Sequence, residues 1–149
     1  MKRNKLLHIV LWAFILHTVW EFAQCLFLYD MWDWPFWKAT IWMLAAIFGD
    51  ILIVIGLWKM TSAFMRDKHI QPTILKEYTL LVGLSFPVSI FLEWMAKVLN
   101  LWQYSSNMAV IELFNYQVGL SPVLQITFLP ALSIYLAEKS TRKGYQNTK

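Results

Sequence analysis

Charged side chains, cysteine and histidine are scarce in this chain of 149 residues. Asp, Glu, Lys and Arg together make up 15% of it, whereas 58% of the residues are hydrophobic and 17% are aromatic. A soluble globular domain carries a much larger charged fraction, so that class is excluded. The single cysteine, Cys25, cannot form an intrachain disulfide, and its place within an apolar stretch indicates packing rather than chemistry.

Long polar stretches are also absent, and four apolar blocks occupy most of the chain instead. Each block is long enough to cross a hydrocarbon layer of about 30 Å as a helix. The blocks cover roughly residues 6–29, 40–60, 78–99 and 118–137. They leave no room for a separate soluble domain, so we expect an all-α fold in which residues 1–149 form one four-helix transmembrane bundle.

The distribution of basic residues predicts the orientation of this bundle. Lys and Arg precede the first block, follow the fourth and fill the connection between the second and third, while the other two connections hold only Lys38 and Lys97. The positive-inside rule then places both termini and the 61–77 connection in the cytoplasm. We expect a multi-pass protein of the bacterial plasma membrane, whose net charge of +4 reflects topology and not a nucleic-acid partner.

The first block interrupts its apolar run with three hydrophilic residues. His17, Glu21 and Gln24 are spaced at i, i+4 and i+7, which places them on one face of a helix. An ionisable side chain in the membrane costs about 2.5–3.5 kcal/mol on insertion, so such residues usually mark a functional site. This face is therefore the predicted centre of the site.

The other blocks contribute hydrophilic residues at a similar depth. Counted at about 1.5 Å per residue from the cytoplasmic side, His17 and Asp50 lie about half way across, and Glu21, Glu93 and Gln125 lie at about two thirds. If these groups faced lipid separately, insertion would cost about 10 kcal/mol or more, so we expect them to face one another. The predicted layer lies toward the outer surface.

Two local patterns predict how Asp50 and Glu93 are accommodated. Ala45 and Gly49 form a small-xxx-small pair, which predicts a tight helix contact beside Asp50. Glu93 and Lys97 form an i, i+4 pair, and the alternative to a functional role is that this lysine neutralises the carboxylate.

The connection before the fourth block is apolar in its second half. Residues 108–116 predict a short interfacial helix or a lid over the mouth of the bundle. Aromatic residues crowd both outer connections, which is typical of an interfacial belt.

Three carboxylates near a histidine suit general acid/base chemistry. In a site of low dielectric they cannot all stay ionised, so at least one holds a proton, and His17 can take or give one. We expect Glu21 or Glu93 to act as the acid, with Asp50 and His17 as tuning partners. The expected substrate is a membrane lipid or another lipid-soluble molecule, such as an isoprenoid, that is isomerised, cyclised or hydrolysed. The residues expected to bind it are Gln24, Gln125, Trp20, Trp94, Trp102 and Tyr104.

Three other interpretations stay open. A metal site would use the ligands His17, Glu21, Asp50 and Glu93, but one histidine is few for iron or zinc, and we expect neither a metal nor a cofactor. A proton-coupled transporter or a carrier of hydrophobic ligands, working as a homodimer, would need the same buried carboxylates. In a structural subunit the polar layer would only hold helices together, at about 0.6 kcal/mol per contact.

Two resemblances add to these expectations. The spacing His17-x-x-x-Glu21 on a first helix, with carboxylates on later helices, resembles the emopamil-binding/sigma-2-receptor type of membrane domain. That resemblance implies protonation of a sterol double bond by membrane-embedded acidic residues. Over most of its length the chain also resembles small bacterial four-span membrane proteins of unknown function, which implies the fold and no activity. The motifs shared with them are Trp20-Glu21-x-x-Gln24, Gly49-Asp50, Glu93-Trp94, Trp102-x-Tyr104-Ser105 and Gly119-Leu-Ser-Pro122-x-x-Gln125.

Overall fold

The computed structural model describes residues 2–31, 33–67 and 74–146, which form four helices and one β-hairpin. The elements are α1 (Lys2–Phe27), α2 (Phe36–Asp67), α3 (Ile74–Val98), β1 (Val110–Leu113), β2 (Tyr116–Gly119) and α4 (Leu120–Gln146). The four helices coincide with the four apolar blocks. The helices extend beyond the predicted blocks at the end of the bundle where α1 begins and α4 ends. The charged residues next to each block there continue the same helix.

All four helices are long and apolar enough to cross a membrane, which identifies a membrane protein. The candidate spans are Lys5–Phe27, Phe36–Arg66, Leu75–Val98 and Leu120–Thr141. Their outward faces carry large hydrophobic side chains, such as Val19, Leu52 and Phe91, which are more than half exposed. An apolar outer surface of this extent is suited to contact with lipid.

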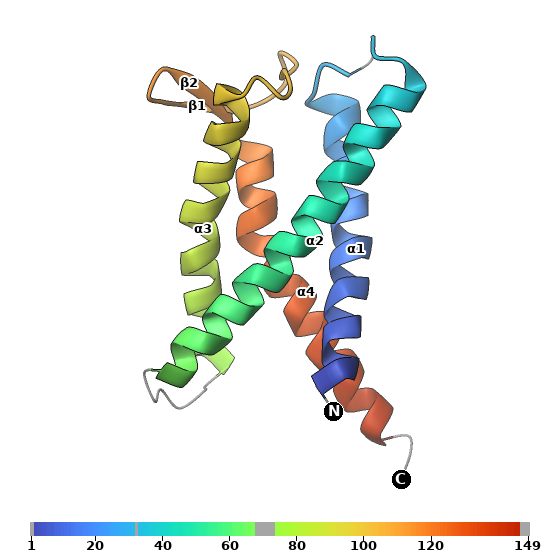
Figure 1. Ribbon diagram of the computed structural model, residues 1–149, viewed down its shortest axis with the longest axis vertical. Helices are drawn as coiled ribbons and strands as arrows, with labels where there is room; N and C mark the ends of the chain where they lie inside the picture. Colours follow the sequence, from blue (N-terminus) through green and yellow to red (C-terminus); the bar gives the residue numbers. More distant parts are fainter. Residues whose placement is uncertain (1, 32, 68–73, 147–149) are drawn as a thin grey trace.

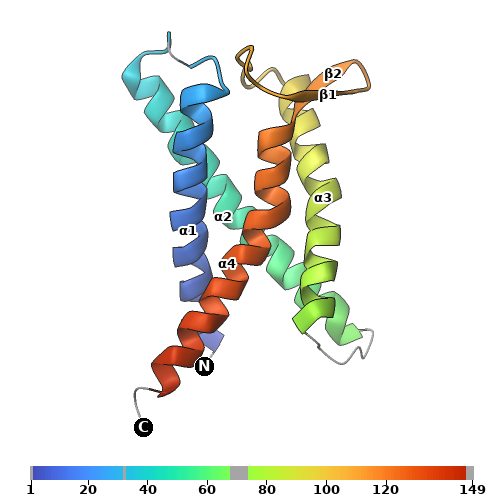
Figure 2. The same ribbon diagram turned by 180° about the vertical axis from the view of Figure 1, so that it is seen from behind.

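The helices are inclined to one another. Figures 1 and 2 show α1 and α3 on opposite sides of the bundle, with α2 and α4 running diagonally between these sides. Helix α4 packs against both α1 and α3, and α2 packs chiefly against α1. The two chain ends lie at one end of the bundle and the hairpin lies at the other (Figure 1). We call these the terminal end and the hairpin end.

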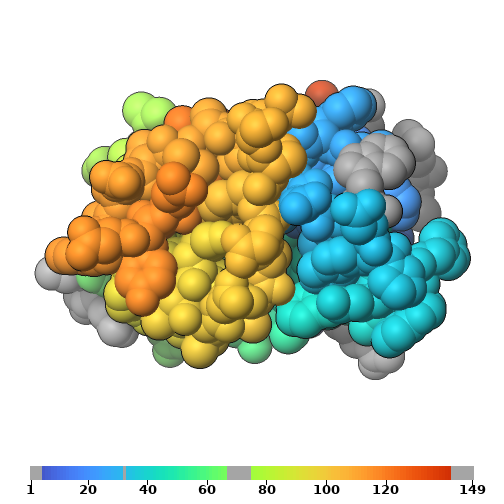
Figure 3. Space-filling model, turned by 90° about the horizontal axis from the view of Figure 1, so that it is seen from above, coloured from blue at the N-terminus to red at the C-terminus, as the bar shows by residue number. Residues whose placement is uncertain are grey.

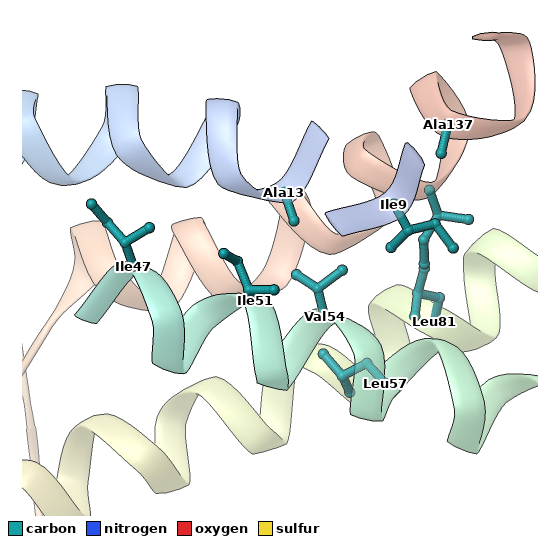
Figure 4. Packing of buried hydrophobic residues seen from close by; sticks show 9 residues of the cluster. Ile9, Ala13, Ile47, Ile51, Val54, Leu57, Leu81 and Ala137 are labelled. Atoms are coloured by element: carbon teal, nitrogen blue, oxygen red, sulfur yellow. The ribbon is translucent and has the colours of Figure 1, made fainter. Parts of the chain in front are cut away.

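A packed apolar cluster extends from the terminal end of the bundle to the level of Asp50 on α2. Figure 4 shows its members on α2 arranged along one side of that helix. All four helices contribute to the cluster, whose members are Ile9, Ala13, Ile47, Ile51, Val54, Leu57, Leu81, Ile134 and Ala137. Apolar packing of these side chains holds the helices together here, and hydrogen bonds from Lys5 to Glu138 and from Trp12 to Ser140 add to it nearer the terminal end.

The segment before α4 is a hairpin, so the predicted interfacial helix is wrong. Strands β1 and β2 pair antiparallel, with Val110 opposite Gly119 and Leu113 opposite Tyr116. The two residues between the strands, Phe114 and Asn115, both have positive φ (48° and 64°), as a tight two-residue turn requires. Asn tolerates this conformation, and the β-branched residues of β1 favour an extended backbone over a helix.

The two connections at the hairpin end are joined through their backbones. An isolated β-bridge pairs Tyr29 with Tyr104, the amide of Asp30 donates to Gln103 O at 3.2 Å, and the amide of Ser105 donates to Leu28 O at 3.0 Å. Figure 3 looks onto this end, where the segment after α1 meets the segment after α3 edge to edge. Together they roof the space between the helices.

Candidate functional site

A cavity of about 320 Å³ lies inside the hairpin-end half of the bundle. Side chains from all four helices and from both roofing connections form its wall, and most of them are apolar. The hydrophilic ones include Glu21, Gln24, Asp50, Ser89, Glu93 and Gln125. The three carboxylates that the sequence predicts to converge therefore border the same space.

The periodicity of α1 explains why its hydrophilic face points inward. His17, Glu21 and Gln24 are buried, with 0%, 6% and 4% of their surfaces exposed, while Val19 and Phe22 between them point outward. A helix with this pattern can satisfy its hydrophilic side chains only by turning them toward other helices, because lipid offers them no partners.

The amide of Gln125 on α4 links α1 to α2. Its Nε2 donates to Glu21 Oε1 at 2.9 Å and to Asp50 Oδ2 at 2.6 Å. The Oε1 of Gln125 accepts a hydrogen bond from Gln24 Nε2 at 2.8 Å. Gln24 Nε2 also donates to Glu21 Oε1, likewise at 2.8 Å. The amide of Gln125 thus bridges the carboxylates of Glu21 and Asp50 through one nitrogen atom, which holds Glu21 Oε1 and Asp50 Oδ2 close to each other.

The directions of these hydrogen bonds assign the tautomer of His17. Its Nδ1 lies 2.8 Å from Asp50 Oδ2 and 3.1 Å from Gln125 Nε2. Both hydrogens of Gln125 Nε2 are already directed at carboxylates, so His17 Nδ1 carries a proton and donates it to Asp50. Its Nε2 is buried and has no hydrogen-bond partner. Asp50 therefore orients the ring, which fits the predicted pairing of these two residues.

Two members of this network were not predicted as site residues. Ser121 Oγ donates to Gln24 Oε1 at 3.0 Å, and Cys25 Sγ lies 3.8 Å from Glu21 Oε2. Each lies four residues from a predicted member of its own helix, Ser121 from Gln125 and Cys25 from Glu21. This i, i+4 spacing is the signal by which the sequence indicates them.

Glu93 on α3 is held separately, from the roof. Trp102 Nε1 donates to Glu93 Oε1 at 3.1 Å, and the hydroxyl of Tyr104 donates to the same oxygen. The amide of Gly119, at the end of β2, donates to the Tyr104 oxygen at 3.0 Å. A chain of donors therefore runs from the hairpin through a phenol to an intramembrane carboxylate.

Tyr104 is well suited to remain a donor in this chain. Burial and the neighbouring Glu93 carboxylate raise the pKa of Tyr104 above its ordinary value, so the phenol keeps its proton. Gly119 lies under the ring, since a Cβ there would lie 3.1 Å from Tyr104 Cζ and 3.2 Å from Met108 Sδ. Only a residue without a side chain leaves Tyr104 in this position.

In the part of the chain that the structure describes, Lys97 forms no direct ion pair with Glu93, although the two charges attract each other. The ammonium of Lys97 donates to Trp102 O at 3.0 Å and to Gln103 Oε1 at 3.5 Å. The lysine ion pair within the described part of the chain is that of Lys5 with Glu138, which does not involve Lys97. Lysine side chains near a helix end reach toward the membrane surface, and here Lys97 holds the roof instead of the carboxylate.

Each carboxylate is hydrogen-bonded mainly through one oxygen. Glu21 Oε1, Asp50 Oδ2 and Glu93 Oε1 each accept two hydrogen bonds. Among the residues that the structure describes, the second oxygens receive only the weak contact of Cys25 to Glu21 Oε2. One oxygen fixes the position of each group, and the other is available to carry or accept a proton.

The predicted binding residues divide into two groups. Gln24, Trp102 and Gln125 line the cavity, whereas Tyr104 is connected to it through Glu93. Trp20 and Trp94 are not among the described residues of the cavity wall, and their indole nitrogens are buried without partners. Trp94 packs instead on the hairpin, where its ring centre lies 6.3 Å from that of Phe114 and 6.2 Å from that of Tyr116.

Gly49 borders open space, so the predicted tight helix contact is wrong. A Cβ at Gly49 would meet no atom within 4 Å, and both Ala45 and Gly49 line the cavity. The small side chains thus widen the cavity beside Asp50 instead of bringing two helices together.

The donor set does not form a metal site. Within residues 2–31, 33–67 and 74–146, no group of three or more His, Cys, Asp or Glu side chains is placed to hold an ion. The oxygens of Glu21 and Asp50 are instead directed at the amide of Gln125, and Glu93 is directed at the roof.

No family model, no curated protein and no solved structure matches this chain.

Proposed function

We propose that this protein is a membrane-embedded enzyme that transfers protons to and from a lipid-soluble substrate. Isomerisation, cyclisation or hydrolysis of an isoprenoid or sterol-like molecule would use this chemistry. The observation that carries the proposal is that three carboxylates, each with one oxygen held and one available, border a single apolar cavity. Buried carboxylates in an apolar cleft are characteristic of acid/base sites.

The three carboxylates have different roles in this proposal. Glu21 or Glu93 is the acid, because each is buried and has one oxygen free of strong hydrogen bonds. Asp50 and His17 are positioning and tuning partners, since their mutual hydrogen bond and the amide of Gln125 hold them next to Glu21.

The closed half of the bundle supports an enzyme over a transporter. Transport requires a path that reaches both membrane surfaces in turn. The cavity wall extends on α2 only to Ile53 and on α3 only to Ser89, and toward the terminal end Leu57 and Leu81 are buried in the apolar cluster between the helices. A substrate that enters the cavity is therefore expected to leave by the way it came.

We also propose that both chain ends face the cytoplasm of a bacterium, so that the hairpin end lies at the outer surface of the plasma membrane. The concentration of Lys and Arg at the terminal end supports this orientation.

Comparative lipid analysis of a deletion strain tests the proposed activity. The strain is complemented with the wild-type gene or with Glu21→Gln, Asp50→Asn or Glu93→Gln, and each variant is checked for its level in the membrane. The loss of a working acid lowers turnover by about 10²–10⁴-fold, so a substrate lipid accumulates and a product disappears. Glu112→Gln is the matched control, because this exposed carboxylate lies on β1 and not on the cavity wall. Unchanged lipid composition in all three cavity variants would contradict the proposal.

A further inference from the structure

A second hollow opens at the hairpin end, next to the cavity. It has a volume of about 420 Å³ and lies between the start of α2 and the connection after α3. Its polar wall consists of Asp30, Lys38, Asn100 and Gln103. This is the region that Figure 3 views from above, where those two parts of the chain meet. A polar hollow at the end of a membrane bundle lies at the level of lipid head groups.

The hollow and the cavity share part of their walls. Trp42, Leu101 and Trp102 line both spaces. Trp102 is also the residue whose indole donates to Glu93. The two spaces are therefore neighbours, separated by three side chains.

One face of α2 connects the two spaces along the helix. Lys38 lies in the hollow, Trp42 borders both, and Gly49 and Ile53 line the cavity. Their spacing of four or seven residues keeps them on one side of the helix. Lys38 and Asp50 are separated along this helix by about 18 Å, at about 1.5 Å per residue. A ligand that reaches from one to the other is long, with a polar end and an apolar chain.

The charges of the hollow indicate the chemistry of the polar end. The ammonium of Lys38 lies 3.9 Å from the ring centre of Trp34 and, in the part of the chain that the structure describes, forms no ion pair. Asp30 likewise has no cationic partner there, and it is tied to Gln103 only through its backbone amide. One unpaired cation and one unpaired anion line the same hollow.

We propose that the hollow binds a zwitterionic head group that contains a phosphate and an ammonium, while the chains of the same lipid enter the carboxylate cavity. Lys38 pairs with the phosphate and Asp30 with the ammonium. An anionic head would face the Asp30 carboxylate, and an uncharged head would leave both charges without partners. This inference rests on the proposed function and changes one part of it, since the lipid-soluble substrate of the cavity is then a lipid with a zwitterionic head group and not a sterol.

Competitive lipid binding tests the head-group site. The detergent-purified protein is mixed with equal amounts of phosphatidylethanolamine, phosphatidylglycerol and diacylglycerol that carry the same acyl chains, and bound lipid is counted by native mass spectrometry. We expect phosphatidylethanolamine to be bound roughly three- to tenfold more than either competitor, the effect of one or two partly exposed ion pairs. Asp30→Asn is expected to move the preference toward phosphatidylglycerol, because the hollow becomes net positive. Lys38→Gln is expected to reduce the preference for phosphatidylethanolamine over diacylglycerol, because the phosphate loses its partner.

Two matched variants control for general effects of charge. Asp33→Asn removes an exposed carboxylate from the same connection, and Lys59→Gln removes an exposed lysine from the far part of α2; neither residue lines the hollow. Equal binding of all three lipids by the wild type, or the same change of preference in the control variants, would overturn the head-group site. If Asp30→Asn has no effect while Glu21→Gln still alters cellular lipids, the head-group site is wrong and the acid/base proposal stands. The opposite result is a lipid preference that changes as expected in Asp30→Asn and Lys38→Gln, with unchanged cellular lipids in all three carboxylate variants. It would support the head-group site and contradict the acid/base proposal.

Discussion

The two halves of this bundle are built from the same four helices and are filled in opposite ways. Near the terminal end the helices close on aliphatic side chains, whereas near the hairpin end they surround a cavity with three carboxylates. Helix α2 takes part in both, since Ile51 and Val54 pack in the cluster while Asp50 and Ile53 line the cavity. Because apolar packing dominates the first half and the hydrogen-bonded carboxylates lie in the second, mutations should separate stability from function.

Truncation in the packed half is expected to have the largest effect on stability. Leu81→Ala removes a side chain that is 1% exposed and leaves a hole that its neighbours cannot fill. The free energy of unfolding should fall by about 2–5 kcal/mol, as measured by denaturant titration in detergent. Leu75→Ala, on the same helix at a site that is 77% exposed, is the control and should change it little. Equal losses from both variants would show that the cluster does not hold this half together.

Removal of the bridging amide is expected to have the next largest effect. Gln125→Leu keeps the volume but deletes the hydrogen bonds to Glu21, to Asp50 and from Gln24. At about 0.6 kcal/mol per contact the free energy of unfolding should fall by roughly 2 kcal/mol, together with loss of the proposed activity. Gln117→Leu, on the exposed side of β2, serves as the control. A fully stable and active Gln125→Leu variant would show that neither stability nor activity depends on this amide.

The roof should respond to a single added methyl group. Gly119→Ala places a Cβ 3.1 Å from the Tyr104 ring and displaces the phenol that donates to Glu93. We expect a loss of about 1 kcal/mol in the free energy of unfolding and a lower activity. Gly83→Ala is the comparison, because a Cβ there meets nothing within 4 Å and the helix gains propensity. If the two alanines behave alike, Tyr104 does not depend on Gly119.

Filling the cavity should have the smallest effect on stability and a clear effect on function. Gly49→Leu extends a side chain into open space beside Asp50, and a helix interior prefers Leu to Gly. The variant should be more stable by about 0.5 kcal/mol and still lose substrate turnover. Gly56→Leu, also in open surroundings on α2 but not on the cavity wall, should gain similar stability and keep its activity. Retained turnover in Gly49→Leu would mean that the substrate binds elsewhere.

Much of the candidate site follows from the sequence, because a membrane leaves few places for hydrophilic side chains. The i, i+4, i+7 spacing of His17, Glu21 and Gln24 predicts one buried face, and all three side chains are buried. Depth along the spans predicts that Asp50 and Glu93 meet that face, and both carboxylates border the cavity. The pairing of charges was harder to predict, since nearness along a helix favoured Lys97 as the partner of Glu93, whereas the roof supplies Trp102 and Tyr104.

The sequence by itself determined that this is a four-helix membrane protein and which of its side chains cannot face lipid, because hydropathy and helical spacing are local properties of the chain. Only the tertiary structure decided that residues 110–119 form a hairpin, that Gly49 borders a cavity and not another helix, and that one glutamine bridges two carboxylates. Those features depend on how the helices are inclined and on which backbones meet at the roof. Such distances between residues far apart in the chain are set by packing, and no spacing along the sequence encodes them.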